Sequence, residues 1–316
     1  MNHYYLGIDT SCYTTSCAIV DQEGNLIGEA RRLLQVKSGA CGLQQSEMVF
    51  QHTRALPDLI ESLTLDGSIS AIGVSAFPRR EDNSYMPAFL VGLGHARTLA
   101  HILKIPLYRF SHQENHILAA LRQIKSIPME PFYSLHVSGG TTELLYCQYD
   151  TSGCFHTELV GGSLDLHGGQ FVDRVGVALG FHFPAGPMME KAANKAFTYD
   201  PLPSSVKNGY ISFSGPYSEM MRRIQRCKMP NEMALSVFKC IAKSLDKMIS
   251  YHVQQRPALT LVAVGGVMSN QFLRHQLERT TGKLHMKLVL ADAKYSCDNA
   301  TGNAFGASLL HQACGG

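Results

Sequence analysis

Two histidines with the spacing of metal ligands stand out in this chain. His112 and His116 are four residues apart, and Ser111 before them is a favourable N-cap for a helix. On a helix both imidazoles would lie on one face, and imidazole is a common metal ligand. A carboxylate from elsewhere would complete the site, and Asp298 is our candidate third ligand. Two alternatives remain open: the histidines are ordinary surface or core residues, and Asp298 is the N-cap of the helix that follows it.

Glycine-rich turns follow two apolar strands in the second half of the chain. Val137-Ser-Gly-Gly-Thr141 ends one strand, and Val264-Gly-Gly-Val267 ends another. Glycine lets the backbone come close to a ligand, and successive N–H groups can bind phosphate oxygens. A tight turn also needs glycine for steric reasons alone. The pair of turns therefore indicates a nucleotide site, with a purely structural role as the alternative.

Two polar residues near these turns are candidate ribose contacts. Asp173 lies inside a predicted helix, before the turn Pro184-Ala-Gly-Pro187, and Asn270 follows the second Gly-Gly pair. A short carboxylate or amide can hydrogen-bond a ribose hydroxyl. The same side chains can equally cap a helix or turn. The sequence alone leaves both roles open.

An internal repeat links the two halves. With an offset of 127 residues, Ser11 aligns with Ser138, and Thr14-Thr15 aligns with Thr141-Thr142. Each copy consists of an apolar strand, a small hydroxyl-rich turn and a second strand. Such a duplication predicts two related lobes whose hairpins face each other across a nucleotide-binding cleft.

The elements that must position these residues alternate between strands and helices, which is typical of an α/β fold. Besides the two hairpins, the sequence predicts strands at residues 24–33, 70–76, 105–110, 259–264 and 289–291. It predicts helices at residues 46–65, 87–103, 168–180, 187–196, 216–225, 231–255 and 299–312, and others beginning at 111 and 269.

Prolines at 128 and 131 mark a hinge between two parts of the chain. We therefore expect an N-terminal lobe of residues 1–130 and a C-terminal lobe of residues 131–299, with a last helix, about 300–316, packed back on the first lobe.

The composition is that of a globular protein. Of 316 residues 45% are hydrophobic and 17% charged, and the net charge of +3 is too small to imply nucleic acid by itself. No apolar stretch has membrane length and the N-terminus lacks a signal-peptide pattern, so we expect a cytoplasmic protein without membrane contact.

The nine cysteines form no C-x-x-C pair, which disfavours a zinc ribbon or a disulfide framework. Two basic clusters, Arg79-Arg80 and Arg222-Arg223, are consistent with phosphate contacts or with solvated surfaces.

Several motifs in order along the chain resemble those of the TsaD family, the tRNA threonylcarbamoyladenosine transferases. The similar segments are Gly7-Ile-Asp-Thr-Ser-Cys12, His52-Thr-Arg54, His112-Gln-Glu-Asn-His116, Val137-Ser-Gly-Gly140, Ser212-Phe-Ser-Gly215, Val264-Gly-Gly-Val-Met-Ser-Asn270 and Cys297-Asp-Asn299. They span nearly the whole chain, and their shared order is far more specific than any single motif.

The resemblance implies an actin-like ATPase fold (the ASKHA, ribonuclease H-like class) with two duplicated lobes and an inter-lobe cleft. It implies that His112, His116 and Asp298 bind a divalent metal, iron or zinc. It also implies nucleotide contacts, to ATP, ADP or threonylcarbamoyl-AMP, at His136, Val137, Ser138, Gly139, Gly140, Asp173, Gly186 and Asn270. The implied reaction transfers a threonylcarbamoyl group to N6 of adenosine 37 of tRNA. An implied partner is a related protein of actin-like fold, in a heterodimer.

The chain also departs from the family pattern. Tyr13 and Thr14 stand where the family has an Asp-Glu pair, and Thr141 stands where it has histidine. The segment Asp165-Leu-His-Gly-Gly-Gln170 retains one of two aspartates and lacks the family's glutamate, and Phe77-Pro-Arg-Arg-Glu-Asp-Asn-Ser-Tyr85 replaces a glycine-rich loop. These positions are candidates for proton transfer or charge stabilisation. An alternative function is therefore a catalytically altered paralogue that acts as a nucleotide-binding partner or regulator.

Overall fold

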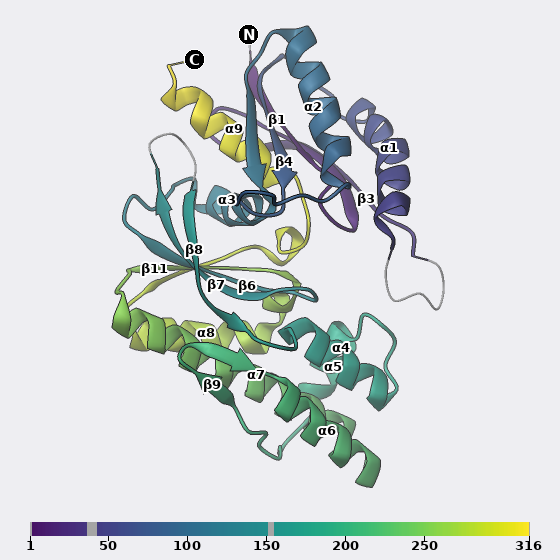
Figure 1. The fold of residues 1–316 in the computed structure, drawn as a ribbon, viewed down its shortest axis with the longest axis vertical. Coiled ribbons are helices and arrows are strands. Elements are labelled where there is room, and N and C mark those ends of the chain that lie inside the picture. Colours follow the sequence, from purple (N-terminus) through teal and green to yellow (C-terminus); the bar gives the residue numbers. More distant parts are fainter. Residues whose placement is uncertain (1, 37–42, 151–154, 316) are drawn as a thin grey trace. The chain divides into compact units, whose positions relative to one another are not determined.

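The computed structural model describes residues 2–36, 43–150 and 155–315 (Figure 1). Contacts divide the chain into two compact units. The first consists of Met1–Ile127, Tyr149–His156 and Cys297–Gly316, and the second of Pro128–Gln148 and Thr157–Ser296. The C-terminal segment that belongs to the first unit thus begins at Cys297, slightly earlier than the expected residue 300. Cys41 and Cys154 lie outside the described residues.

The first unit is built on a five-stranded sheet with the order β3-β2-β1-β4-β5. The hairpin strands β1 and β2 are antiparallel, as are β2 and β3, whereas β4 and β5 run parallel to β1. The strands are β1 (His3–Asp9), β2 (Thr14–Val20), β3 (Leu26–Leu33), β4 (Ser68–Phe77) and β5 (Leu107–Ser111). The helices are α1 (Gln45–Glu61), α2 (Phe89–Leu103), α3 (His112–Ile124) and α9 (Thr301–Ala313).

The second unit is built on a seven-stranded sheet with the order β12-β11-β6-β7-β8-β10-β9. One hydrophobic core joins this sheet to all five of the longer helices of the unit. The strands are β6 (Phe132–Val137), β7 (Thr142–Tyr149), β8 (Phe155–Ser163), β9 (Ser205–Lys207), β10 (Tyr210–Ser212), β11 (Thr260–Val264) and β12 (Lys287–Leu290). The helices are α4 (Gly168–Leu179), α5 (Gly186–Ala193), α6 (Ser214–Arg226), α7 (Pro230–Gln255) and α8 (Gln271–Lys283), with short 3₁₀ turns at Gly266–Ser269 and Ala293–Tyr295.

The sheet pairings confirm the sequence repeat at the level of single residues. In the first hairpin Ile8 pairs with Cys17. Adding the offset of 127 to both numbers gives Leu135 and Leu144, which pair in the second hairpin. The order β3-β2-β1-β4-β5 also recurs as β8-β7-β6-β11-β12, and β9 and β10 extend the second sheet beyond the shared part. The two units are therefore copies of one strand–hairpin topology.

Helices cover both faces of the first sheet. Alternate residues of a strand point to opposite faces, and β1 follows this rule: Leu6 and Ile8 join a core with α1 and α2, whereas Tyr5 joins a second cluster with the alanines of α9. Helix α9 packs on β1 and β4 and against α3, as the yellow helix in Figure 1 shows. The C-terminal helix is therefore a structural layer of the first unit.

Missing side chains let α9 approach the sheet closely. A Cβ atom on Gly7 would lie 2.2 Å from the carbonyl oxygen of Ala300, and one on Gly73 would lie 2.0 Å from the carbonyl oxygen of Asn303. On the other side of the helix, a Cβ on Gly302 would lie 1.9 Å from the carbonyl oxygen of Asn115. These distances are far below van der Waals contact, so glycine is needed at all three positions.

The predicted elements are present, with ends that differ by a few residues. Helix α1 was expected to reach residue 65 but ends at Glu61. Strands β8, β9 and β10 were not predicted: β8 alternates irregularly between buried and exposed residues, and the other two strands have three residues each. Among the described residues, no helix combines the length and apolar character that a membrane span needs.

The contact between α9 and the sheet yields a first prediction. We expect Gly73→Ala to lower the free energy of unfolding by about 3 kcal/mol, because the added methyl group collides with the backbone of Asn303. Gly94→Ala is the matched control, because Gly94 is exposed in α2 with open space around its Cβ. That change should raise the free energy of unfolding by about 0.5–1 kcal/mol. Urea unfolding followed by circular dichroism measures both. Equal stability of the two variants would contradict the close packing of α9.

Candidate functional site

Helix α3 carries both predicted histidine ligands. Its first turn is fixed by a capping box, in which the Glu114 amide donates to Ser111 Oγ (3.1 Å) and the Ser111 amide donates to Glu114 Oε2 (2.6 Å). One turn apart on the same face, His112 and His116 place their Nε2 atoms 3.2 Å from each other. The helix, its cap and the shared face are as the sequence predicts.

Asp298 meets this pair of histidines from the segment that precedes α9. Its Oδ1 atom lies 3.7 Å from His112 Nε2 and 3.5 Å from His116 Nε2. The alternative role as N-cap is wrong, because the N-cap residue of α9 is Ala300. The Asn299 side chain instead accepts a hydrogen bond from the Thr301 amide at 3.0 Å. The carboxylate of Asp298 is thus available to the two imidazoles; we call the three side chains the His-His-Asp cluster.

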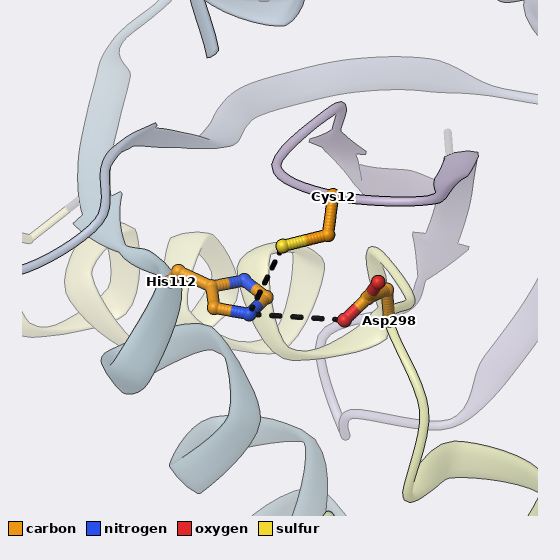
Figure 2. Close-up of side chains that lie close together, drawn as sticks. All are labelled: Cys12, His112 and Asp298. Atoms are coloured by element: carbon orange, nitrogen blue, oxygen red, sulfur yellow. Dashed lines mark hydrogen bonds and ion pairs between the residues drawn. The ribbon is translucent and has the colours of Figure 1, made fainter. Parts of the chain in front are cut away.

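A cysteine from the β1–β2 turn also lies beside this cluster. Figure 2 shows Cys12, His112 and Asp298 converging from three separate segments. Cys12 Sγ lies 3.9 Å from His112 Nε2, and each of the three residues places a ligand atom within 4.8 Å of the other two. Sequence reasoning missed the place of Cys12 beside the cluster because no spacing pattern connects it with α3.

A buried histidine holds the backbone of Cys12 in place. His52 Nε2 lies 3.0 Å from the Cys12 carbonyl oxygen, and His52 Nδ1 lies 2.8 Å from Thr15 Oγ1. Because a carbonyl can only accept, Nε2 carries the proton, and Nδ1 accepts from the threonine hydroxyl. Burial lowers the pKa of His52, which favours this neutral form. The motif histidine on α1 therefore fixes the turn that carries the thiol.

Asn115, between the two histidines, fixes the segment that carries Asp298. Its Nδ2 donates to the carbonyl oxygen of Asn299 (2.7 Å), and its Oδ1 accepts from the Asn303 amide (2.8 Å). The same Nδ2 lies 3.3 Å from Asp9 Oδ2. All these groups are buried. Asn115 was not predicted to have this role, although its place between two candidate ligands on a helix is a signal that could have found it.

The distances within the His-His-Asp cluster fit a bound metal ion. For tetrahedral coordination with metal–nitrogen and metal–oxygen bonds of about 2.05 Å, neighbouring ligand atoms lie about 3.3 Å apart. The three separations are 3.2, 3.5 and 3.7 Å. The donor set, two imidazoles and one carboxylate, suits zinc and iron. The residues present therefore fit the metal that the sequence implies.

Charge in this region also favours a cation. Burial raises the pKa of Asp9 to about 7, and the charge of Asp298 adds to the rise. Burial lowers the pKa of His112 to about 4, and the neighbouring His116 lowers it further, whereas Asp298 opposes the shift. Burial, with the charges of Asp298 and Asp9, also raises the pKa of Cys12 well above its usual range. Without a cation, buried negative charge is thus disfavoured and His112 is neutral, the form that binds metal.

The loop that follows β4 is anchored to α3 by Arg80. Arg80 donates from Nε to Glu114 Oε1 (3.0 Å) and from Nη2 to Glu114 Oε2 (2.9 Å), and Nη2 also donates to the Arg109 carbonyl. Glu114 itself is buried. A buried carboxylate that accepts a bidentate guanidinium is a strong contact. Arg80 is therefore a structural anchor beside the His-His-Asp cluster.

In the second unit, the two glycine turns lie next to each other. Strands β6 and β11 are parallel neighbours, and Val264 pairs with His136 at their C-terminal ends. Gly265 has φ +101°, and a Cβ there would lie 2.3 Å from the Val137 carbonyl oxygen, so only glycine fits. By contrast, Gly139 and Gly140 have open space where a Cβ would be. The first turn is therefore open to a ligand, whereas the second is packed tightly against it.

Asp173 and Asn270 both act as caps. Asp173 Oδ1 accepts from the Ala185 amide at 2.8 Å, just before α5 begins at Gly186. Asn270 Oδ1 accepts from the Leu273 amide at 2.9 Å and is the N-cap of α8. Burial raises the pKa of Asp173, and the backbone hydrogen bonds oppose this shift. The structure therefore has the capping role for both residues, and their contact with a ribose stays a prediction.

The remaining predicted nucleotide residues frame the same edge of the sheet. Val137 belongs to the hydrophobic core, and the buried His136 packs beside Gly265. Ser138 closes the first turn through a hydrogen bond from its amide to the Thr141 carbonyl (2.8 Å). At the start of α5, Gly186 has open space where a Cβ would be. A ligand at this edge would therefore meet mainly backbone groups.

Two solved structures share the architecture of this chain over nearly their whole length. Component A of the (R)-2-hydroxyglutaryl-CoA dehydratase of Acidaminococcus fermentans aligns over 98% of this chain and 99% of its own, with a TM-score of 0.58 and 13% identity. A ROK family glucokinase from Streptomyces griseus, in complex with glucose and AMPPNP, aligns over 98% and 99% of the two chains, with a TM-score of 0.56 and 10% identity. The fold of this chain is thus the actin-like α/β fold, as predicted.

At the level of sequence, the pattern of the TsaD family, tRNA N6-adenosine threonylcarbamoyltransferase, matches residues 51–305. The tRNA N6-adenosine threonylcarbamoyltransferase of Buchnera aphidicola subsp. Baizongia pistaciae (strain Bp) is 28% identical over 317 aligned positions, which cover 97% of this chain and 92% of that protein. The chain belongs to the TsaD family, which confirms the resemblance found in its motifs.

The raised pKa of Asp9 yields a second prediction. The pKa of Asp9 in the folded protein, about 7, lies above its value in the unfolded chain. The contribution of Asp9 to the free energy of unfolding is therefore present at low pH and is lost as pH rises towards 7. In metal-free protein, Asp9→Asn removes this loss. Its free energy of unfolding, relative to the parent, should therefore increase by about 2 kcal/mol between pH 5 and pH 8. Urea unfolding in the presence of a chelator measures the difference. Gly94→Ala removes no titrating group and should show a constant difference; an equally constant difference for Asp9→Asn would contradict a buried, protonated Asp9.

Proposed function

We propose that this protein binds a divalent metal in its first unit and a nucleotide in its second, and transfers a threonylcarbamoyl group from threonylcarbamoyl-AMP to N6 of adenosine 37 of tRNA. The observation that carries the proposal is the convergence of His112, His116 and Asp298, with ligand atoms 3.2–3.7 Å apart, in a member of this family. These residues come from two segments far apart in sequence, and buried hydrogen bonds from Asn115 join the segments. Such an arrangement is difficult to explain as general packing.

The residues of the first unit would hold the metal and keep its ligands deprotonated. A bound divalent ion would supply a Lewis acid that polarises an oxygen of the acyl donor. His112 and His116 would provide neutral nitrogen ligands, and Asp298 a negative oxygen ligand. Asn115 would act as a positioning residue, since it holds the backbone next to Asp298. The donor set is compatible with iron and with zinc.

The residues of the second unit would hold the nucleotide through the backbone. The turn has open space at the Cβ positions of Gly139 and Gly140, and the amide groups of these two residues would donate to phosphate oxygens. The turn at Gly265 lies next to it, because β11 and β6 are parallel neighbours that end side by side. Asp173 and Asn270 would support the site indirectly, because each caps a helix or turn that borders it. Adenylate is a good leaving group, so binding of its phosphate favours transfer of the acyl group.

The catalytically altered paralogue is the second candidate. Tyr13, Thr14 and Thr141 stand in place of acidic and imidazole residues of the family pattern. Thr14 is the first residue of β2 and is buried. Thr142, which follows Thr141, is the first residue of β7 and is also buried. In this case the protein would bind nucleotide and metal and would pair with a related actin-like protein without transferring the acyl group itself. The two candidates differ only in the chemical step, so an assay of that step separates them.

The transfer reaction tests the proposed function directly. We expect the protein, supplied with tRNA and an enzyme that forms threonylcarbamoyl-AMP, to incorporate labelled threonine into tRNA. His116→Ala should reduce this incorporation at least about 100-fold, because loss of a direct ligand costs more than loss of a supporting contact. It should also remove most of the metal measured by elemental analysis. Normal incorporation by metal-free His116→Ala would refute the metal's role.

A control variant shows whether replacing a histidine outside the metal site also affects metal content or incorporation. His275→Ala changes a histidine on α8 outside the His-His-Asp cluster and should retain both metal and incorporation. If the parent protein binds metal and nucleotide but labels no tRNA under conditions where an authentic transferase is active, the altered-paralogue function is supported instead.

Nucleotide binding at the open glycine turn is a separate prediction. ATP or ADP at about 100 times its Kd should stabilise the folded protein by about 2.7 kcal/mol and raise its Tm by several degrees. Gly140→Val should abolish the shift, because its side chain would fill the open space at the turn without a clash in the fold. Gly282→Ala, also at an open position but on α8, should retain the shift. A full shift in Gly140→Val would place the nucleotide elsewhere.

A further inference from the structure

The thiol of Cys12 lies beside two members of the His-His-Asp cluster, His112 and Asp298. In a tetrahedral site with a metal–sulfur bond of about 2.3 Å, sulfur and nitrogen ligand atoms lie about 3.6 Å apart. Cys12 Sγ is 3.9 Å from His112 Nε2 and within 4.8 Å of an Asp298 carboxylate oxygen. A separation of 3.9 Å is long for a hydrogen bond to nitrogen and close to the spacing of two ligands that share an ion.

The position of this thiol is set by the fold. His52 donates to the Cys12 carbonyl oxygen, and the following residue, Tyr13, accepts from the Leu34 amide through its own carbonyl at 2.8 Å. On the other side, the Ser11 amide donates to Asp9 Oδ1 at 3.1 Å. Hydrogen bonds thus fix the backbone of the turn at three successive residues. A ligand held in this way needs little reorganisation to bind a metal.

We propose that Cys12 is a direct metal ligand, which completes a Cys-His-His-Asp site; this inference rests on the metal site of the proposed function. Binding replaces the thiol proton with the metal ion, and the proton leaves to solvent. One thiolate and one carboxylate then neutralise the charge of a divalent ion. A thiolate ligand favours zinc over magnesium at such a site.

A site with four protein ligands has a consequence for the reaction. Because tetrahedral zinc with four protein ligands has no open position, an oxygen of the acyl donor would have to bind as a fifth ligand or displace one of the four. Cys12 is the ligand on the β1–β2 turn, whereas the others lie on or next to helices α3 and α9. The thiol on this turn would therefore determine whether the metal is closed or open to the substrate.

Cobalt substitution tests this assignment. We expect Co²⁺ bound to the metal-depleted protein to show a near-ultraviolet thiolate-to-cobalt charge-transfer band together with intense visible bands of tetrahedral cobalt. Cys12→Ser should lose the charge-transfer band and bind zinc about 100-fold more weakly, while it still binds one cobalt through the remaining ligands. Cys297→Ser is the matched control, because Cys297 is exposed and adjacent to Asp298, and this variant should keep the band. A band that persists in Cys12→Ser, or is lost in Cys297→Ser, would overturn the assignment.

A second measurement uses the unaltered protein and does not depend on how the variants fold. X-ray absorption at the zinc edge of the zinc-loaded protein should show one sulfur neighbour at about 2.3 Å, together with nitrogen and oxygen neighbours at about 2.0–2.1 Å. A zinc environment without sulfur would overturn the proposal.

The two levels of inference fail in different ways. If His116→Ala removes bound cobalt while the parent lacks a thiolate band, the His-His-Asp site stands and the role of Cys12 is refuted. If the parent binds no cobalt at all, the metal site itself is refuted, and with it the role of Cys12.

Discussion

The close contact of α9 with β1, β4 and α3 is the constraint on which the metal cluster depends. Asp298 lies three residues before this helix, so its carboxylate reaches the histidines only if α9 lies deep against the sheet. Gly7 and Gly73 remove the side chains that would hold the helix away. The buried Asn303 then donates to the Ile8 carbonyl (2.7 Å) and to Ser75 Oγ (2.9 Å), which fixes the helix on both central strands. Packing of small residues thus sets the geometry of a polar site.

The polar groups around this contact are favourable only as a set. Asp9 is fully buried, and its pKa rises to about 7, because an isolated carboxylate is poorly solvated there. Asn115 links Asp9, the Asp298 segment and α9 through one amide side chain. A divalent cation would offset the cost of burying two carboxylates, whereas the fold without it retains a protonated Asp9. The same arrangement that disfavours negative charge without a cation therefore favours metal binding.

Local signals predicted the fold class and the histidine pair. Capping of α3 by Ser111 and the four-residue spacing of the histidines depend on neighbours within one helix turn, and both are as expected. The repeat offset predicted the duplicated sheet, because strand register is a property of the hairpin itself. Roles that need contacts over long sequence separations were missed or wrong. Cys12 and Asn115 contact residues about 100 to 190 positions away, and the capping alternative for Asp298 is wrong because its neighbours lie on α3, as its role as candidate third ligand requires.

The duplicated hairpins show how one local structure can serve two kinds of chemistry. At the offset of 127, Cys12 and Tyr13 of the first turn correspond to Gly139 and Gly140 of the second. In the first unit the turn presents a thiol to the His-His-Asp cluster, and hydrogen bonds from His52 and Ser11 hold it rigid. In the second unit the turn has no side chains at these positions and leaves open space over the backbone. Soft side-chain ligands suit a metal ion, whereas exposed amide groups suit phosphate oxygens. Divergence of two residues within a conserved hairpin topology is thus sufficient to separate a candidate metal-binding turn from a candidate phosphate-binding turn.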